Sequence, residues 1–188
     1  MTESAPRSSL GSRIRDLRRE RGFRTQKDLA DAIEGGNVSL ATIENIESGR
    51  KTNIDVSQLL NIARALRVPP IYLLAPIRAP DAVIDIPNLS SAFDGMTAIE
   101  FDAWLGGVEA GAYRATTVEE RDATAEIQAL RTLESLRSEI TRFEAMLELQ
   151  SDEDDQRFAR STKDRLAEAK READRIEALL GSAGWKLS

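Results

Sequence analysis

Few side chains in this sequence could carry out covalent or metal chemistry. The 188 residues include no cysteine and no histidine, which excludes disulfides, zinc sites, thiol nucleophiles and imidazole bases. A catalytic role for a carboxylate such as Glu47 would need a second acid or a metal ligand beside it, and the sequence offers neither. We therefore predict no catalytic residue, no metal and no cofactor, and a function that rests on non-covalent binding.

Side chains suited to binding concentrate in residues 39–53. The segment SLATIENIESGRK has Ser39 as a helix cap and Gly49 as the terminating residue, and its two isoleucines are spaced so that both turn inward. Arg50 and Lys51 follow this predicted helix directly. Its outward positions are Leu40, Ala41, Thr42, Glu44 and Asn45.

Four more helical segments must position this one. Residues 10–21 have an apolar face surrounded by arginines and end at Gly22. Thr25 followed three residues later by Asp28 is a capping pattern for a second helix, TQKDLADAIEGG. The segments VSQLLNIARALRV and PPIYLLA predict a fourth and a fifth helix after the third. Five short helices joined by brief turns are therefore expected before residue 76.

This arrangement resembles the helix-turn-helix domain of the Cro and lambdoid-repressor (XRE-like) family over residues 10–75. The resemblance is carried by IRDLRRERG, TQKDLA, TIENIESGR and LLNIARALRVPPIYLL. It implies an all-α, five-helix DNA-binding domain whose third helix, residues 39–48, is the recognition helix. An α-helix fits the major groove of B-DNA, where its exposed side chains can reach base edges.

The resemblance also implies which residues contact bases. Leu40, Ala41 and Asn45 align with base-contacting positions of the family, and Thr42 and Glu44 complete the outward set. The Asn45 amide can bind adenine N6 and N7, whereas Leu40 and Ala41 offer apolar contact to a thymine methyl. Packing of Leu40 against the second helix is the alternative.

Phosphate contacts are expected around the same helix. Gln26 matches the family's phosphate-binding glutamine at a helix N-terminus, where unpaired amides favour anions. The further candidates are Thr25, Ser39, Arg50, Lys51 and Asn53, for which simple capping or a solvated loop is the alternative. Glu47 resembles the family glutamate that pairs with an arginine of the first helix, here Arg18, and is therefore predicted to be structural.

Two departures from the family pattern lie beside the second helix. FRTQ has one residue more than usual, and the turn EGGNVS is longer than the compact corner of the family. The recognition helix is therefore expected to lie at a shifted angle, so that Asn37 or Val38 could also approach DNA.

Charge and proline divide the chain. Lys and Arg outnumber Asp and Glu by 12 to 9 in residues 1–76, whereas acids outnumber bases by 23 to 14 in residues 77–188. We predict a DNA-binding domain at 1–75, a linker with a small mixed segment at 76–116, and a helical region at 117–188. In the middle part DAVIDIP could form a short strand and MTAIEFDAWL a short helix. The prolines that mark this boundary are Pro69, Pro70, Pro76, Pro80 and Pro87.

The last part of the chain predicts a long helical hairpin. Residues 112–180 contain neither glycine nor proline, and two apolar runs recur at spacings of three and four, as in a coiled coil. Ser151 and the acids after it make a favourable start for the second arm. One continuous helix is the alternative. The seam residues are Leu133, Leu136, Ile140, Phe143 and Leu147, then Leu166, Ala169, Ala173, Ile176 and Leu180.

Two helices form too narrow a seam to enclose a core, so the hairpin should pack on residues 81–113 or on another subunit. We predict a homodimer that binds double-stranded DNA at a pseudo-palindromic operator, most simply as a repressor. The alternatives are an activator, a monomer on an asymmetric site, an intrachain bundle, and an antitoxin-like regulator whose tail binds a second protein. A self-cleaving protease would need a strand-rich tail.

The expected location is the bacterial cytoplasm, or the host cytoplasm if the protein is phage-encoded. The sequence contains no run of eighteen apolar residues, and its N-terminus lacks the charged and apolar pattern of a signal peptide.

Overall fold

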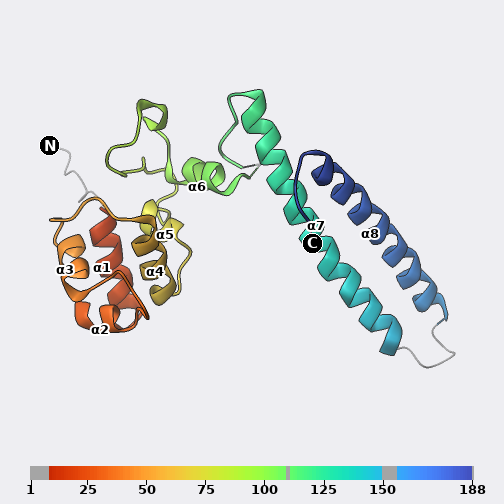
Figure 1. The fold of residues 1–188 in the computed structure, drawn as a ribbon, viewed down its shortest axis with the longest axis horizontal. Coiled ribbons are helices and arrows are strands. Elements are labelled where there is room, and N and C mark those ends of the chain that lie inside the picture. The colour runs from red at the N-terminus through yellow and green to blue at the C-terminus, as the bar shows by residue number, and fades with distance from the viewer. Residues whose placement is uncertain (1–8, 109–110, 150–155, 188) are drawn as a thin grey trace. The chain divides into compact units, whose positions relative to one another are not determined.

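The computed structural model describes residues 9–108, 111–149 and 156–187. These residues are helical and form no strand, which confirms the predicted all-α class. They divide into two compact units (Figure 1). One holds the residues up to Gly106 together with Gly111–Tyr113, and the other holds Gly107, Val108 and the residues from Arg114 onward. The predicted three-part division into residues 1–75, 76–116 and 117–188 stays a prediction.

The first unit begins with five helices, as the sequence predicts. Local hydrogen bonds explain where the helices start: the Ser9 hydroxyl accepts from the Ser12 amide, and Thr25 and Asp28 form a reciprocal capping box. The helices surround one core, in which Ile14, Ile43 and Ile62 are completely buried. They are α1 (Leu10–Glu20), α2 (Gln26–Asp31), α3 (Leu40–Glu47), α4 (Val56–Leu66) and α5 (Ile71–Leu74).

The chain after α5 is tied back to α1 by Arg13. Arg13 is 8% exposed, and its guanidinium donates to both carboxylate oxygens of Asp85 at 2.9 Å. It also donates to the carbonyls of Leu73 at 2.8 Å and Leu74 at 3.1 Å. These two carbonyls belong to α5, so one buried cation joins α1, α5 and the segment around residue 85.

The short strand predicted in DAVIDIP does not form among the described residues. Val83 and Thr97 make a single antiparallel bridge, with Ile84 donating to Met96 at 3.0 Å and Ala98 donating to Ala82 at 2.8 Å. Pairing cannot extend further because Pro87 follows on one side and helix α6 (Ala98–Gly106) begins on the other. The predicted helix in MTAIEFDAWL is confirmed as α6, which follows the 3-10 turn η1 (Ser91–Phe93).

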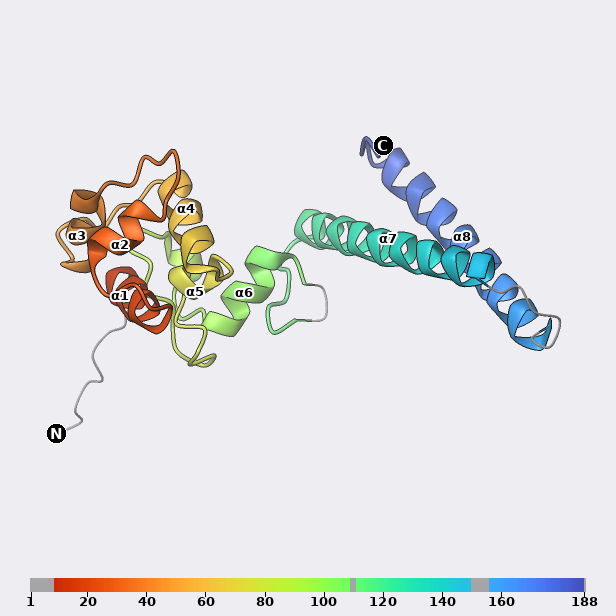
Figure 2. The ribbon, with the colours of Figure 1, turned by 90° about the horizontal axis from the view of Figure 1, so that it is seen from below.

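The second unit is a helical hairpin. Helices α7 (Val118–Leu149) and α8 (Gln156–Ser182) lie side by side and antiparallel (Figures 1 and 2). The two helices are separate, so the alternative of one continuous helix is wrong. The predicted start of the second arm at Ser151 lies outside the described residues. In the part of the chain that the structure describes, no helix is long and apolar enough to cross a membrane.

The seam residues of the hairpin differ in how deeply they are buried. Leu133 and Leu180 are completely buried at its centre, and Phe143 is 7% exposed. Two alanines of α8, Ala169 and Ala173, are buried as well. The remaining predicted seam residues are only partly covered: Leu136, Ile140, Leu147, Leu166 and Ile176.

Candidate DNA-binding surface

Helix α3 presents one polar face and buries the other. Its inward side chains Ile43, Ile46 and Glu47 are all 4% exposed or less. On the outward side Leu40 is 37% exposed and lies outside the hydrophobic core, and Ala41 and Glu44 are exposed too. Thr42 and Asn45 are partly covered. The five predicted base-contacting residues therefore share the face that the core leaves uncovered.

Asn45 is the outward residue with the most hydrogen-bonding capacity. Its backbone carbonyl accepts from the Lys51 amide at 2.9 Å and from the Ser48 hydroxyl at 3.2 Å. Its side-chain amide makes no hydrogen bond to any residue that the structure describes. A carboxamide has two donors and one acceptor oxygen, so this group can form a bidentate contact with a ligand.

The two capping residues are already engaged. The Thr25 hydroxyl accepts from the Asp28 amide at 3.1 Å, and the hydrogen bonds from Thr25 hold the pKa of Asp28 below its usual value. The Ser39 hydroxyl accepts from the Thr42 amide at 3.2 Å. The Ser39 and Thr42 hydroxyls also lie 3.0 Å apart, where either can donate to the other. Both predicted phosphate contacts, Thr25 and Ser39, therefore already cap their helices.

Glu47 joins three helices at a single carboxylate. The Arg18 guanidinium donates to its two oxygens at 2.6 and 3.0 Å, and Gln26 donates to one of them at 3.1 Å. Arg18 is 2% exposed, and its hydrogen bond to Glu47 raises the pKa of the guanidinium. Arg18 also donates to the carbonyls of Phe23 and Arg24, while Arg15 donates to the carbonyl of Glu47. The cluster fixes α1, the start of α2 and the end of α3 together.

The residues that follow α3 are held to different degrees. Arg50 is exposed and makes no ion pair with the residues that the structure describes. The Lys51 ammonium donates to Gln58 at 2.8 Å, which leaves it two further donors. The side-chain amide oxygen of Asn53 accepts from the side-chain amide of Asn88 at 3.3 Å, so the segment after α5 reaches the loop next to α3. Of the two cations, Arg50 is the one without an internal partner among the described residues.

The long turn between α2 and α3 is anchored by Asn37, a role that the sequence did not reveal. The Asn37 amide donates to the Ser57 hydroxyl at 2.6 Å and accepts from Asn61 at 3.2 Å, while Gln58 donates to its backbone carbonyl at 2.9 Å. Val38 is 5% exposed and belongs to the hydrophobic core, so its predicted approach to DNA is wrong. An apolar residue there is more stable packed between the helices than in water.

We expect Asn37→Ala to destabilise the first unit by about 1 kcal/mol, because it removes two side-chain hydrogen bonds that hold the turn to α4. Amide hydrogen exchange in α3 and α4 would measure the change. Asn61→Ala is the matched variant: it removes one of the same two bonds and should cost less. Unchanged exchange in Asn37→Ala would show that the turn does not depend on this side chain.

Comparison with protein families agrees with this geometry. Residues 14–73 match the family model described as Helix-turn-helix. The matched segment contains α2, α3 and α4 in full and most of α1 and α5, so this part of the chain is an XRE-like helix-turn-helix domain. The match confirms the resemblance and supports a DNA-binding regulator. Searches of curated proteins and of solved structures found no match.

Proposed function

We propose that this protein is a sequence-specific transcriptional regulator, most simply a repressor, which binds a pseudo-palindromic operator as a homodimer. The observation that carries the proposal is the outward face of α3 inside a helix-turn-helix domain. On that face Asn45 has a carboxamide that no described residue bonds, and Leu40 and Ala41 are exposed beside it. A bidentate amide and two apolar contacts suit an adenine next to a thymine methyl.

The surroundings of α3 suit the two DNA strands that border a major groove. The N-terminus of α2 presents backbone amides near Gln26, whose side chain Glu47 orients. Arg50 follows the end of α3 after Ser48 and Gly49, and it has no ion pair among the described residues. Contacts to phosphate would fix the register of the domain on DNA, and contacts from α3 would select the sequence.

The homodimer is supported by how little the hairpin buries on its own. Among the described side chains of the second unit, the large apolar ones that are buried are Leu133, Phe143 and Leu180. Burying three such side chains contributes on the order of 5–9 kcal/mol, which is little for two helices of 32 and 27 residues. A second copy would cover the half-exposed seam and complete a four-helix core.

A twofold dimer makes a definite prediction about the operator. Two recognition helices related by a twofold axis read two inverted half-sites, which lie roughly 34 Å or a multiple of it apart on one side of the duplex. The acidic charge of residues 77–188 should keep the hairpin away from the phosphates. Repression then requires only that the bound dimer occupies the promoter, in the cytoplasm of a bacterium or of a phage host.

Selection of random double-stranded DNA on the purified protein, at stated salt, tests this proposal. We expect a pseudo-palindromic motif. Asn45→Ala should relax selectivity at one position of each half-site by about 1–3 kcal/mol. Arg50→Ala is the matched variant and should weaken binding to all sequences alike while lowering the salt dependence. An asymmetric motif would contradict the homodimer, and no motif would contradict specific binding.

A further inference from the structure

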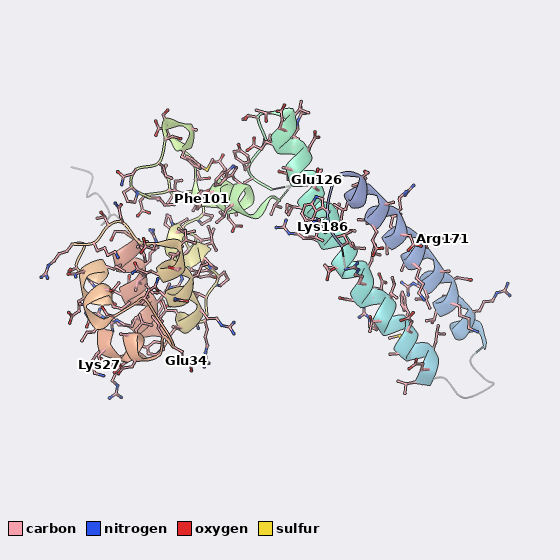
Figure 3. The ribbon with its side chains drawn as sticks, in the orientation of Figure 1. Lys27, Glu34, Phe101, Glu126, Arg171 and Lys186 are labelled. Carbon is pink, nitrogen blue, oxygen red and sulfur yellow. The ribbon has the colours of Figure 1, made fainter. Side chains whose placement is uncertain are left out.

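The two sides of the helical hairpin are built differently. On one side, which we call the ion-paired side, polar bonds cross from α7 to α8. Arg137 donates to Glu177 at 2.8 Å, which raises the pKa of the guanidinium, and Lys170 lies 2.7 Å from Glu144. At the end of the hairpin where Glu126 and Lys186 lie (Figure 3), the Trp185 indole donates to Glu126 at 2.8 Å. These bonds cover the seam on this side.

The opposite side, which we call the open side, carries a groove of about 670 Å³. Leu136, Glu139 and Phe143 of α7 line it, at a spacing of three and four that places them on one helical face. Arg165, Ala169 and Glu172 line it from α8. The guanidinium carbon of Arg165 lies over the Phe143 ring, 5.6 Å from its centre.

Apolar side chains continue along the open side beyond the groove. Met146 is 41% exposed and follows Phe143 by three residues, and Leu179 is 55% exposed and follows the half-covered Ile176 by three. Helical spacing places each of them next to the groove rather than toward the ion-paired side. Among the described residues, exposed apolar side chains therefore extend the open side beyond both ends of the groove.

The charges of the groove favour a second copy of this chain as the occupant. Three arginines and three glutamates line it, so it has no net charge. An antiparallel copy of the same side can set arginines against glutamates, which is what a twofold interface between identical surfaces requires. DNA does not fit this surface, because its three glutamates offset its three arginines and leave no net positive charge for the phosphates.

We propose that two copies of this chain associate open side to open side, so that Leu136, Met146 and Leu179 of each copy become buried in a four-helix core. This inference rests on the proposed homodimer and specifies its interface. The ion-paired sides then face outward, where their charges stay in water.

Single cysteines test the interface directly, because the natural chain contains none. Glu139→Cys and Glu172→Cys place a thiol in the groove. Glu134→Cys and Asp174→Cys are matched variants that also remove an exposed or half-exposed acid, but from positions turned about half a helix circumference away. With a short bis-maleimide we expect a covalent dimer from the groove variants and little from the matched pair. Equal or stronger cross-linking through Glu134→Cys or Asp174→Cys would overturn the proposed interface.

A second pair of variants uses only exposed leucines, so that folding is preserved. Leu179→Lys puts a charge on the open side, and Leu149→Lys makes the same change at a residue that is 83% exposed and off that side. Sedimentation should show that Leu179→Lys raises the dissociation constant of the dimer about tenfold or more, and that Leu149→Lys leaves it unchanged. If Leu179→Lys leaves the dimer intact, the proposed interface is wrong but the homodimer is not contradicted. A monomeric natural protein would contradict the homodimer as well, and another protein would then have to cover the groove.

Discussion

Glu47→Ala is expected to lower the free energy of unfolding of the first unit by about 3–5 kcal/mol, because it leaves a buried guanidinium without its counter-charge. Arg18 is 2% exposed, and Gln26 loses its acceptor at the same time. Since the carboxylate joins α1, α2 and α3, the recognition helix should lose its fixed orientation. Specific DNA binding should therefore fall together with stability.

Amide hydrogen exchange in α1 and α3 measures this effect without interference from the hairpin. Glu44→Ala is the matched control. It also removes a glutamate carboxylate from α3, three residues earlier, but at an exposed position. It should change stability by no more than about 0.5 kcal/mol. If the two variants exchange alike, the cluster around Glu47 does not hold the helices together.

Gly11→Ala is expected to destabilise the same unit by about 2–3 kcal/mol, because α1 and α3 touch at this residue. A Cβ atom at Gly11 would overlap the backbone carbonyl oxygen of Ile46 and press on the Cα of Glu47. A backbone carbonyl cannot rotate aside as a flexible side chain would. The two helices must therefore move apart, which also loosens the core around Ile14 and Ile43.

The same substitution at Gly181, Gly181→Ala, is expected to change the stability in the opposite direction. Gly181 lies within α8, and a Cβ atom there would meet nothing within 4 Å. Because alanine favours the helix over glycine, this variant should stabilise the hairpin by about 0.5–1 kcal/mol. Amide hydrogen exchange, measured separately in each unit as the temperature is raised, distinguishes the two effects. A neutral or stabilising Gly11→Ala would show that α1 does not pack closely on α3.

Local patterns in the sequence were sufficient to predict the helices. Apolar periodicity and capping residues such as Thr25 and Ser39 act within one or two turns, so they can be recognised without knowing the fold. The hairpin followed from a long segment without glycine or proline in the same way. The pairing of Arg18 with Glu47, in contrast, came from the family resemblance and not from the spacing of the residues.

What the sequence could not predict depends on partners that lie far apart along the chain. Arg13 was counted among the arginines around the first helix, but it is buried against Asp85, which lies 72 residues later. Asn37 likewise finds its partners on α4, 20 or more residues away. Local periodicity carries no information about such pairs, and it also could not show that Val38 would be needed to fill the core.

The separation of the two faces of α3 bears on how this protein could change its target over evolutionary time. The anchors Ile43, Ile46 and Glu47 hold the helix in place, whereas Ala41, Glu44 and Asn45 contribute almost nothing to that hold. Substitutions on the outer face can therefore accumulate at little thermodynamic cost. A lineage of such proteins can diverge in the operators it recognises while every member keeps the same scaffold, and a designer can retarget the domain by the same route.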